Sequence, residues 1–335
     1  MATPLKVGLV GTGGISNRHI TAYLEHPDRV KLTAVCDLDE TRAQEFARKA
    51  GVEAVYTDFD KMLREADIDA VDNCTFHPQH APLSIASAEA GKHVIVEKPL
   101  EVTLKRCDRI IRACEHAGVT LSTIFPSRFH ESSQLIKRAI DRGRFGRLTM
   151  GDAYVKWFRT QEYYDSGAWR GTWKLDGGGA LMNQAIHSVD LLTWLMGPVA
   201  QVSAYTSTLT HQRIEVEDVA TATLRFSNGA LGVIEATTAA YPGTLKRIEI
   251  HGSEGSAVLE EEDIKNWEFA RAARGDAALR RRMTGKTESG GGATDPAAIG
   301  HHGHGVAPVG EGIGFRFIGV NRHADRGNAW GVGYG

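Results

Sequence analysis

A strand, a glycine-rich turn and a helix follow one another near the start of the chain, and this succession restricts the fold most. The apolar run Lys6–Val10 leads directly into Gly11–Ser16 (GTGGIS), and a helical pattern over Ile15–Glu25 follows. In such a turn the first glycine permits a tight bend. The second lets the backbone approach a pyrophosphate, which the N–H groups of the helix N-terminus can bind. The small Ser16 replaces the third glycine of the usual fingerprint. We therefore expect a dinucleotide to be bound by Gly11, Gly13, Gly14 and Ile15.

A carboxylate follows the second predicted strand. Asp37 ends the run Leu32–Cys36 and lies 21 residues after Ser16. At that place it can accept hydrogen bonds from an adenosine ribose and would repel a 2′-phosphate, and no basic residue follows immediately. The sequence therefore predicts NAD rather than NADP as the cofactor. The structural alternative is a glycine turn followed by an aspartate that caps a helix. We favour it less, because both features occur in the order that a dinucleotide site requires.

Apolar runs and amphipathic stretches alternate in the first part of the chain. The predicted strands cover residues 6–10, 32–36, 70–74, 94–96 and 119–124. The predicted helices between them cover residues 15–25, 40–50, 60–66, 82–90 and 104–117. Strict alternation of strand and helix indicates right-handed crossovers and a parallel sheet. We expect an α/β fold whose first domain, residues 1–125, is a dinucleotide-binding Rossmann domain.

The second half has a different pattern. One long helix is predicted over Gly179–Met196, and strands then follow over residues 201–210, 219–226, 231–237, 244–251 and 256–260, with the hairpin signal Asn228-Gly229 between two of them. Strands without intervening helices indicate a mostly antiparallel, open sheet. We expect residues 126–285 to form an α+β domain for substrate binding and oligomerisation. Residues 286–335 are rich in glycine, and we expect a loosely ordered tail.

Two groups of polar residues are candidates for chemistry. Lys98 follows an apolar strand in the run Glu97–Leu100 (EKPL), where ligands of open α/β sheets bind, and a lysine there can exchange a proton with a substrate oxygen. A solvated surface lysine is the alternative. Asn183, His187 and Asp190 are spaced four and three residues apart and are expected on one helix face, which favours proton transfer. The alternative is a buried histidine that its helix neighbours satisfy.

Charge and cysteine usage exclude several classes of protein. The chain has 39 Lys and Arg against 41 Asp and Glu, so we expect neither nucleic acid nor a membrane as a partner. No secretion signal or membrane span is visible, and the four cysteines show no metal-site spacing. These features predict a cytoplasmic location and no bound metal. The histidines at 301, 302 and 304 have no carboxylate or cysteine partner nearby, so they are read as part of the tail.

Taken together, several motifs resemble those of the Gfo/Idh/MocA oxidoreductases. They are GTGGIS, TFHPQH (residues 75–80), AGKHVIVEKPL (90–100), WRGTW (169–173) and GGGALMNQAIHSVDLL (177–192). The resemblance implies NAD(P)-dependent hydride transfer at a hydroxyl or carbonyl carbon of a sugar, cyclitol or nucleotide-linked sugar. It also implies a homodimer or homotetramer that forms through the second-domain sheet. A non-catalytic dinucleotide-binding regulator of the same fold is the alternative.

The resemblance also assigns roles to individual residues. It implies catalytic roles for Lys98 and His187, a supporting catalytic and substrate-binding role for Asn183, substrate contact for Arg170, and cofactor contacts for Thr75, His77, His80, Glu97 and Lys98. There are two departures from the family. Many members have aspartate where this chain has Asn183, and the segment after His304 does not resemble the family's closing helix and strand. A frameshifted or diverged C-terminus is our hypothesis for the second departure.

Overall fold

The computed structural model describes residues 3–282, which divide into two compact units. The first unit contains the chain up to Ile124 together with Lys174–Gly177, and the second contains Phe125–Trp173 and the described residues from Gly178 onward. The predicted tail at 286–335, the three histidines within it and the frameshift hypothesis fall outside the described residues. Within residues 3–282, no helix combines the length and the apolar character that crossing a bilayer requires.

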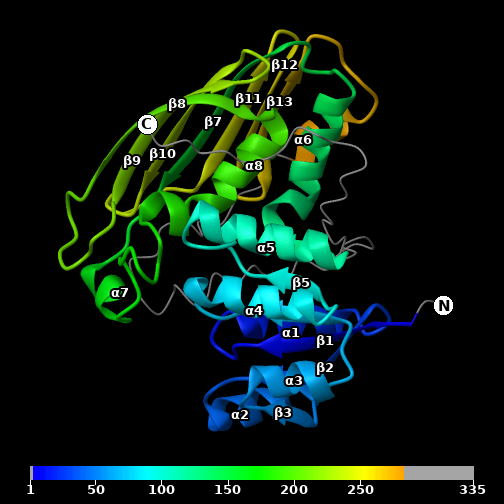
Figure 1. Ribbon diagram of the computed structural model, residues 1–335. Helices are drawn as coiled ribbons and strands as arrows, with labels where there is room; N and C mark the ends of the chain where they lie inside the picture. Colours follow the sequence, from blue (N-terminus) through cyan, green and yellow to red (C-terminus); the bar gives the residue numbers. More distant parts are fainter. Residues whose placement is uncertain (1–2, 283–335) are drawn as a thin grey trace. The chain divides into compact units, whose positions relative to one another are not determined.

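Six parallel strands form the sheet of the first unit, in the order β3-β2-β1-β4-β5-β6 (Figure 1). The strands are β1 (Leu5–Val10), β2 (Val30–Cys36), β3 (Ala54–Tyr56), β4 (Ala70–Asn73), β5 (His93–Val96) and β6 (Leu121–Thr123). The helices are α1 (Ser16–Glu25), α2 (Glu40–Ala50), α3 (Phe59–Glu65), α4 (His77–Glu89) and α5 (Leu104–Ala117). The predicted Rossmann domain with a parallel sheet is therefore confirmed. From β1 the strand order runs outward to β3 on one side, and then from β4 to β6 on the other side. Ligands of such folds bind at this change of order, between β1 and β4.

Capping residues explain why the helices of this unit begin and end where they do. The carboxylate of Asp39 accepts from the Arg42 N–H at the start of α2, and Gly51 ends the helix in the left-handed conformation. Thr103 and Gly118 do the same for α5. Helix α4 begins five residues before its predicted start. Pro82 inside it deprives the Pro78 carbonyl of its helical donor, and the Arg106 side chain donates to that carbonyl instead.

The second unit is built on a sheet of seven strands in the order β13-β12-β11-β7-β10-β9-β8. The strands are β7 (Leu148–Lys156), β8 (Val199–Ser207), β9 (Val219–Phe226), β10 (Leu231–Thr237), β11 (Arg247–Gly252), β12 (Gly255–Glu260) and β13 (Asp263–Phe269). Only the β7–β10 pair is parallel among the strands of residues 3–282 that form this sheet, so the predicted mostly antiparallel sheet is confirmed. Asn228 and Gly229 form the β9–β10 turn, as predicted, with Gly229 at φ +87°.

Helices cover one face of this sheet (Figure 1). The helical segments are a short 3-10 helix (Pro126–Phe129), α6 (Glu131–Asp141), α7 (Gln161–Asp165), a π-helical turn (Ala180–Gln184), α8 (Ile186–Met196) and α9 (Asp276–Arg282). The side chains of α6 and α8 pack onto the inward residues of the central strands. The fully or almost fully buried members of this core include Ile136, Phe145, Leu192, Met196, Phe226, Ile250 and Leu259. The opposite face of the sheet is much more exposed.

The prediction of one helix over Gly179–Met196 is wrong. The segment begins as a π-helical turn, in which the Ala185 N–H donates to the Ala180 carbonyl at 2.9 Å, and only then continues as α8. At Gly179 a Cβ atom would be 1.8 Å from the Glu217 carbonyl oxygen, so only glycine fits where the chain passes the loop before β9.

Candidate functional site

The glycine turn of the first unit provides an open surface at the end of β1. Gly11 has φ +90°, and a Cβ atom there would be 2.9 Å from the backbone of Cys74, so glycine is required. Gly13 and Gly14 are exposed, with no described atom within 4 Å of an added Cβ. Ser16 is fully buried, and its hydroxyl donates to the Gly13 carbonyl at 2.6 Å, which holds the turn against α1. The turn therefore has open space at Gly13 and Gly14, as the approach of a phosphate group requires.

Asp37 lies next to this turn at the end of β2. Its Oδ2 atom accepts from the backbone N–H and the hydroxyl of Thr12, at 2.8 and 2.9 Å. Its Oδ1 atom accepts from the Asp39 N–H and from Arg42 Nη2, both at 3.0 Å. Partial burial favours the neutral carboxyl, but these hydrogen bonds outweigh it and lower the pKa of Asp37 below its usual range. Asp37 is thus held as an anion beside the turn, which fits a ribose and disfavours a 2′-phosphate.

Arg42 is a basic residue that the sequence analysis did not consider. It lies in the first turn of α2, which Asp39 caps. Its guanidinium forms ion pairs with both Asp37 and Asp39. Its position three residues after a capping aspartate was a sequence signal, because N3 residues face back toward the cap.

The predicted residues after β4 lie close together. The Thr75 hydroxyl donates to the Asn73 side chain at 2.6 Å, and His77 opens α4 with Nδ1 2.9 Å from the Asp176 carbonyl. Burial lowers the pKa of His77 to about 4. His80 has no exposed surface, and its ring nitrogens lie 2.9 and 3.1 Å from the carbonyls of Pro99 and Thr75. His80 thereby connects the loop after β4 to the loop after β5; the cofactor contacts of these residues stay predictions.

A buried network of charged groups lies behind the loop after β5. His19 on α1 is placed between two carboxylates, with Nδ1 2.7 Å from Asp72 and Nε2 2.9 Å from Glu97. The Tyr23 hydroxyl donates to Asp72 at 2.6 Å, and the second Glu97 oxygen accepts from the Lys98 N–H at 3.0 Å. The network therefore reaches the backbone of the predicted catalytic lysine. Glu97 is almost fully buried.

Sequence reasoning missed His19 and Asp72. A signal existed, since Asp72 is a charged residue in the short buried strand β4, and a buried charge needs a partner. Burial by itself would lower the pKa of His19, but the attraction of Asp72 and further hydrogen bonding outweigh it and raise this pKa well above its usual value.

Lys98 lies in the loop after β5, two residues beyond the last residue of the strand. It is partly exposed. The Gly11 turn, Asp37, Thr75 and Lys98 all follow the carboxyl ends of neighbouring parallel strands, so they share one edge of the first unit. This is the arrangement from which a Rossmann domain binds a nicotinamide dinucleotide.

The predicted residues of the second unit lie on and after the π-helical turn. The Glu217 carboxylate accepts from the N–H groups of Gly179 and Leu181 at 3.0 and 2.9 Å, so it caps the turn. Asn183 lies within the turn, and its N–H donates to the Gly179 carbonyl. His187 lies in the first turn of α8, with the edge of its ring against Phe125 at a centroid distance of 5.9 Å. Glu217 is a second residue that sequence reasoning missed.

Asp190 does not belong with Asn183 and His187. It is buried and accepts two hydrogen bonds from Arg128, at 2.7 and 2.5 Å. Burial raises the pKa of Asp190 even though this ion pair opposes the shift. The three predicted polar residues do not share one regular helix, because Asn183 lies in the π-helical turn before α8. His187 and Asp190 do lie on α8, where Asp190 forms an ion pair with Arg128.

Arg170 lies against aromatic rings of the same unit. Its guanidinium is 4.2 Å from the centroid of Tyr163 and 4.5 Å from that of Trp169. It is partly exposed, and among residues 3–282 it forms no ion pair. A guanidinium in this state is available to a ligand, as the predicted substrate contact requires.

Comparison with known proteins agrees with this geometry. Residues 5–125 match the model of an oxidoreductase family with an NAD-binding Rossmann fold, and residues 133–258 match the GFO/IDH/MocA C-terminal domain. Myo-inositol 2-dehydrogenase of Thermotoga maritima is 34% identical over 263 residues, which cover 75% of this chain and 74% of that protein. Levoglucosan dehydrogenase of Pseudarthrobacter phenanthrenivorans is 30% identical, covering 83% of this chain and 78% of the relative.

Solved structures give the same result. The WlbA dehydrogenase of Chromobacterium violaceum, in complex with NADH and UDP-GlcNAcA, superposes with a TM-score of 0.79 at 38% identity, covering 84% of this chain and 82% of the other. The WlbA dehydrogenase of Bordetella pertussis superposes with the same TM-score at 40% identity and the same coverage. These matches confirm the resemblance that the motifs indicated.

Replacement of Gly11 tests the phosphate turn. We expect Gly11→Ala to weaken NADH binding at least about tenfold, because the new Cβ meets the Cys74 backbone and the positive φ is unfavourable. Gly91→Ala is the control, since Gly91 also has a positive φ but open space around it. Titration followed by NADH fluorescence measures both variants. Equal affinity of Gly11→Ala and the wild type would contradict the assignment.

The His19 network predicts a pH dependence of stability. Because the pKa of His19 is raised on folding, its stabilisation is fully present below the unfolded value near pH 6.5 and is lost as pH rises through the folded pKa. The free energy of unfolding of the wild type should therefore exceed that of His19→Gln most at low pH, by about 1.4 kcal/mol per unit of pKa shift. Urea unfolding across the pH range measures this, with the exposed His116→Gln as control. A pH-independent difference would refute a charged His19.

Proposed function

The chain belongs to the Gfo/Idh/MocA oxidoreductases, and on that premise we propose that it transfers hydride between NAD and a hydroxyl-bearing carbon of a sugar, cyclitol or nucleotide-linked sugar. The observation that carries the proposal is the retention of both candidate proton-handling groups, Lys98 after β5 and His187 after the π-helical turn. Relatives named for myo-inositol and levoglucosan, and structures containing UDP-GlcNAcA, support a polyhydroxylated ring as the substrate.

The residues around the glycine turn fit the proposed cofactor. The open backbone at Gly13 and Gly14 would hold the pyrophosphate, and the anionic Asp37 would accept from the adenosine ribose. Bound NAD supplies the hydride acceptor, which no side chain of the protein can replace. Thr75, His77 and Glu97 support the proposal as residues at the same sheet edge, while the fully buried His80 would act by positioning the loops.

Two side chains are proposed to handle the proton of the substrate hydroxyl. His187 accepts this proton in the oxidative direction, and Lys98 donates a hydrogen bond to the same oxygen and stabilises its developing negative charge. Asn183 orients the substrate or the imidazole, and Arg170 contacts the substrate. An asparagine cannot place a charge against an imidazolium, so positioning is the role left to Asn183.

Assembly and location are part of the proposal. The outer face of the second-unit sheet carries exposed apolar side chains, Met150 and Leu231 among them, which are neighbours on β7 and β10. We propose that this face forms a homodimer or homotetramer. The four cysteines form no disulfide, and three of them are buried, which supports a reducing compartment such as the cytoplasm.

Substitution of the two catalytic candidates tests the mechanism. Lys98→Ala and His187→Gln should each lower kcat by roughly 10²–10⁴, because both side chains handle the substrate proton. His187→Gln should also leave NADH affinity near that of the wild type, since His187 is assigned no cofactor contact. NADH absorbance with a panel of inositols, free sugars and UDP-linked sugars measures turnover. Lys105→Ala, an exposed lysine on α5, is the control. NADH binding without turnover across the panel would favour the non-catalytic regulator instead.

The proposed assembly face predicts an effect on mass. Leu231→Arg should shift the protein to a smaller species in sedimentation velocity, because a buried guanidinium without a partner destabilises an apolar interface. Leu24→Arg places the same charge at an exposed leucine of α1 and should leave the mass unchanged. An unchanged mass of Leu231→Arg, or a wild type that is monomeric, would contradict the proposal.

A further inference from the structure

Arg159 is a buried arginine whose charge has no counter-ion in the described part of the chain. Its residue is 5% exposed, and no carboxylate of residues 3–282 lies within ion-pair distance. Nη1 donates to the Phe158 carbonyl and Nη2 to Gln184 Oε1, both at 3.1 Å. The buried Nε atom has no hydrogen-bond partner among these residues. Burial lowers the pKa of Arg159, as expected for a cation that lacks a compensating anion.

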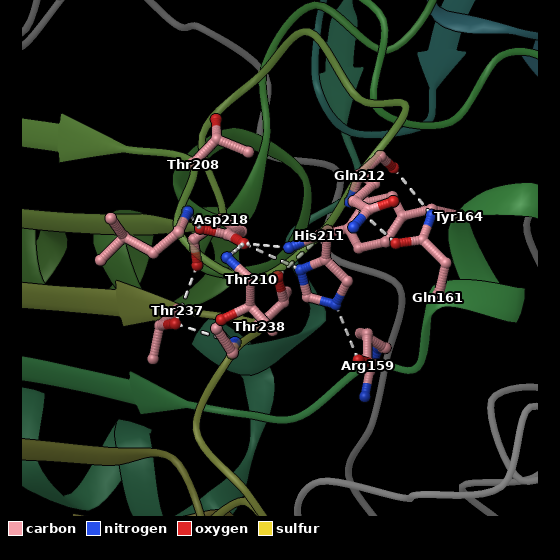
Figure 2. A network of polar contacts seen from close by, with 12 residues as sticks. Arg159, Gln161, Tyr164, Thr208, Thr210, His211, Gln212, Asp218, Thr237 and Thr238 are labelled. Carbon is pink, nitrogen blue, oxygen red and sulfur yellow. Dashed lines mark hydrogen bonds and ion pairs between the residues drawn. The ribbon is translucent and has the colours of Figure 1, made fainter.

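The backbone of Arg159 is fixed by a second network, which Figure 2 shows. Its N–H donates to the Thr238 carbonyl at 2.8 Å, and its carbonyl accepts from His211 Nε2 at 2.8 Å. The other ring nitrogen of His211 is 2.9 Å from the fully buried Asp218. Asp218 also accepts from the N–H groups of Leu209, Thr210 and His211. The backbone that carries the guanidinium is therefore held by hydrogen bonds on both sides, and such support is what a precise binding site needs.

A second guanidinium lies on the same aromatic side chain. The centroid of the Tyr163 ring is 5.5 Å from the guanidinium carbon of Arg159 and 4.2 Å from that of Arg170. The acid groups nearby are engaged elsewhere: Asp165 pairs with Arg213 at 2.6 Å, and Asp218 is held by His211. Two cations around one ring, without an acid between them, concentrate positive charge inside the second unit.

This pair of arginines adjoins the turn that carries the proposed substrate residues. Gln184, which accepts from Arg159, directly follows Asn183 in the π-helical turn and donates from its amide to the Tyr163 hydroxyl at 2.9 Å. Arg159 is almost fully buried, whereas Arg170 is partly exposed, so the positive charge extends from the interior toward the surface.

We propose that Arg159 and Arg170 form an oxyanion subsite of the substrate pocket, which binds a carboxylate or phosphate group carried by the sugar. A buried cation without a partner is costly, and a planar guanidinium matches both of these oxyanions. The inference rests on the proposed function only in assigning the oxyanion to the substrate. It narrows the substrate from any polyhydroxylated ring to an acidic one.

Matched ligand pairs test the proposal. We would titrate NADH-loaded protein by calorimetry with glucose, glucuronate and glucose 6-phosphate, and with UDP-N-acetylglucosamine and its uronic acid. In at least one comparison the acidic ligand should bind about tenfold or more tightly than its neutral counterpart. The glucuronate and glucose 6-phosphate arms separate a carboxylate site from a phosphate site. If no acid binds more tightly than its counterpart, the proposal is overturned.

Charge-removing variants assign the preference to these residues. Arg159→Met and Arg170→Met should each reduce the ratio of acid to neutral affinity toward one. Arg213→Met, an exposed arginine paired with Asp165, is the control and should keep the ratio. Equal losses for acidic and neutral ligands would show a structural arginine and refute the subsite.

Two further results keep the test decisive. If thermal melting shows that Arg159→Met does not fold, Arg159→Lys and Arg170→Met replace it in the comparison. Arg159→Lys is expected to retain part of the ratio of acid to neutral affinity.

The test also distinguishes failure of the subsite from failure of the proposed reaction. A preference for acids that persists without any sugar-dependent NADH formation would reject the proposed reaction but retain the subsite, whereas turnover without a preference would do the reverse.

Discussion

The close approach of Gly11 to the loop after β4 is the constraint on which the first unit depends. With 2.9 Å between an imagined Cβ and the Cys74 backbone, only glycine allows the chain to leave β1 and turn into α1 at this place. This turn leads directly into α1, and His19 of α1 forms hydrogen bonds with Asp72 and Glu97. The same turn thus carries the amides proposed to bind phosphate and leads into the helix whose His19 contacts Glu97, the residue before Lys98.

Periodicity and turn chemistry predicted much of the fold. The bounds of α2, α5, β9 and β10 agree with the sequence pattern, because each is a regular run between clear capping or turn residues. Strand β3 has only three residues, and β7 and β13 carry charged or glycine residues in their alternation, so local patterns could not separate them from loops. Their place in the sheets comes from long-range pairing, which no local window contains.

For the candidate site, the sequence allowed the residues themselves to be predicted but not their contact partners. Motif positions predicted Lys98, Asp37 and His187 as candidates, because the ends of strands and the starts of helices can be predicted from the sequence. The partners of these residues could not be read in the same way. Glu217 reaches Gly179 across 38 residues, and Glu97 reaches His19 across 78. Such contacts depend on the packed tertiary structure, and one of them caps the π-helical turn.

The two units differ in how completely their buried charges are paired. In the first unit, every charge of the inner network faces an opposite one, since His19 lies between two carboxylates. In the second, Asp190 and Asp218 have cationic or N–H partners, whereas the partners of Arg159 among residues 3–282 are neutral groups and aromatic rings. A protein interior rarely leaves a charge uncompensated without a reason outside the stability of the fold. In the same unit the buried Asp218–His211 pair, which also holds the loop at residues 209–211, fixes the backbone of this arginine. Recognition of an anion explains both features together.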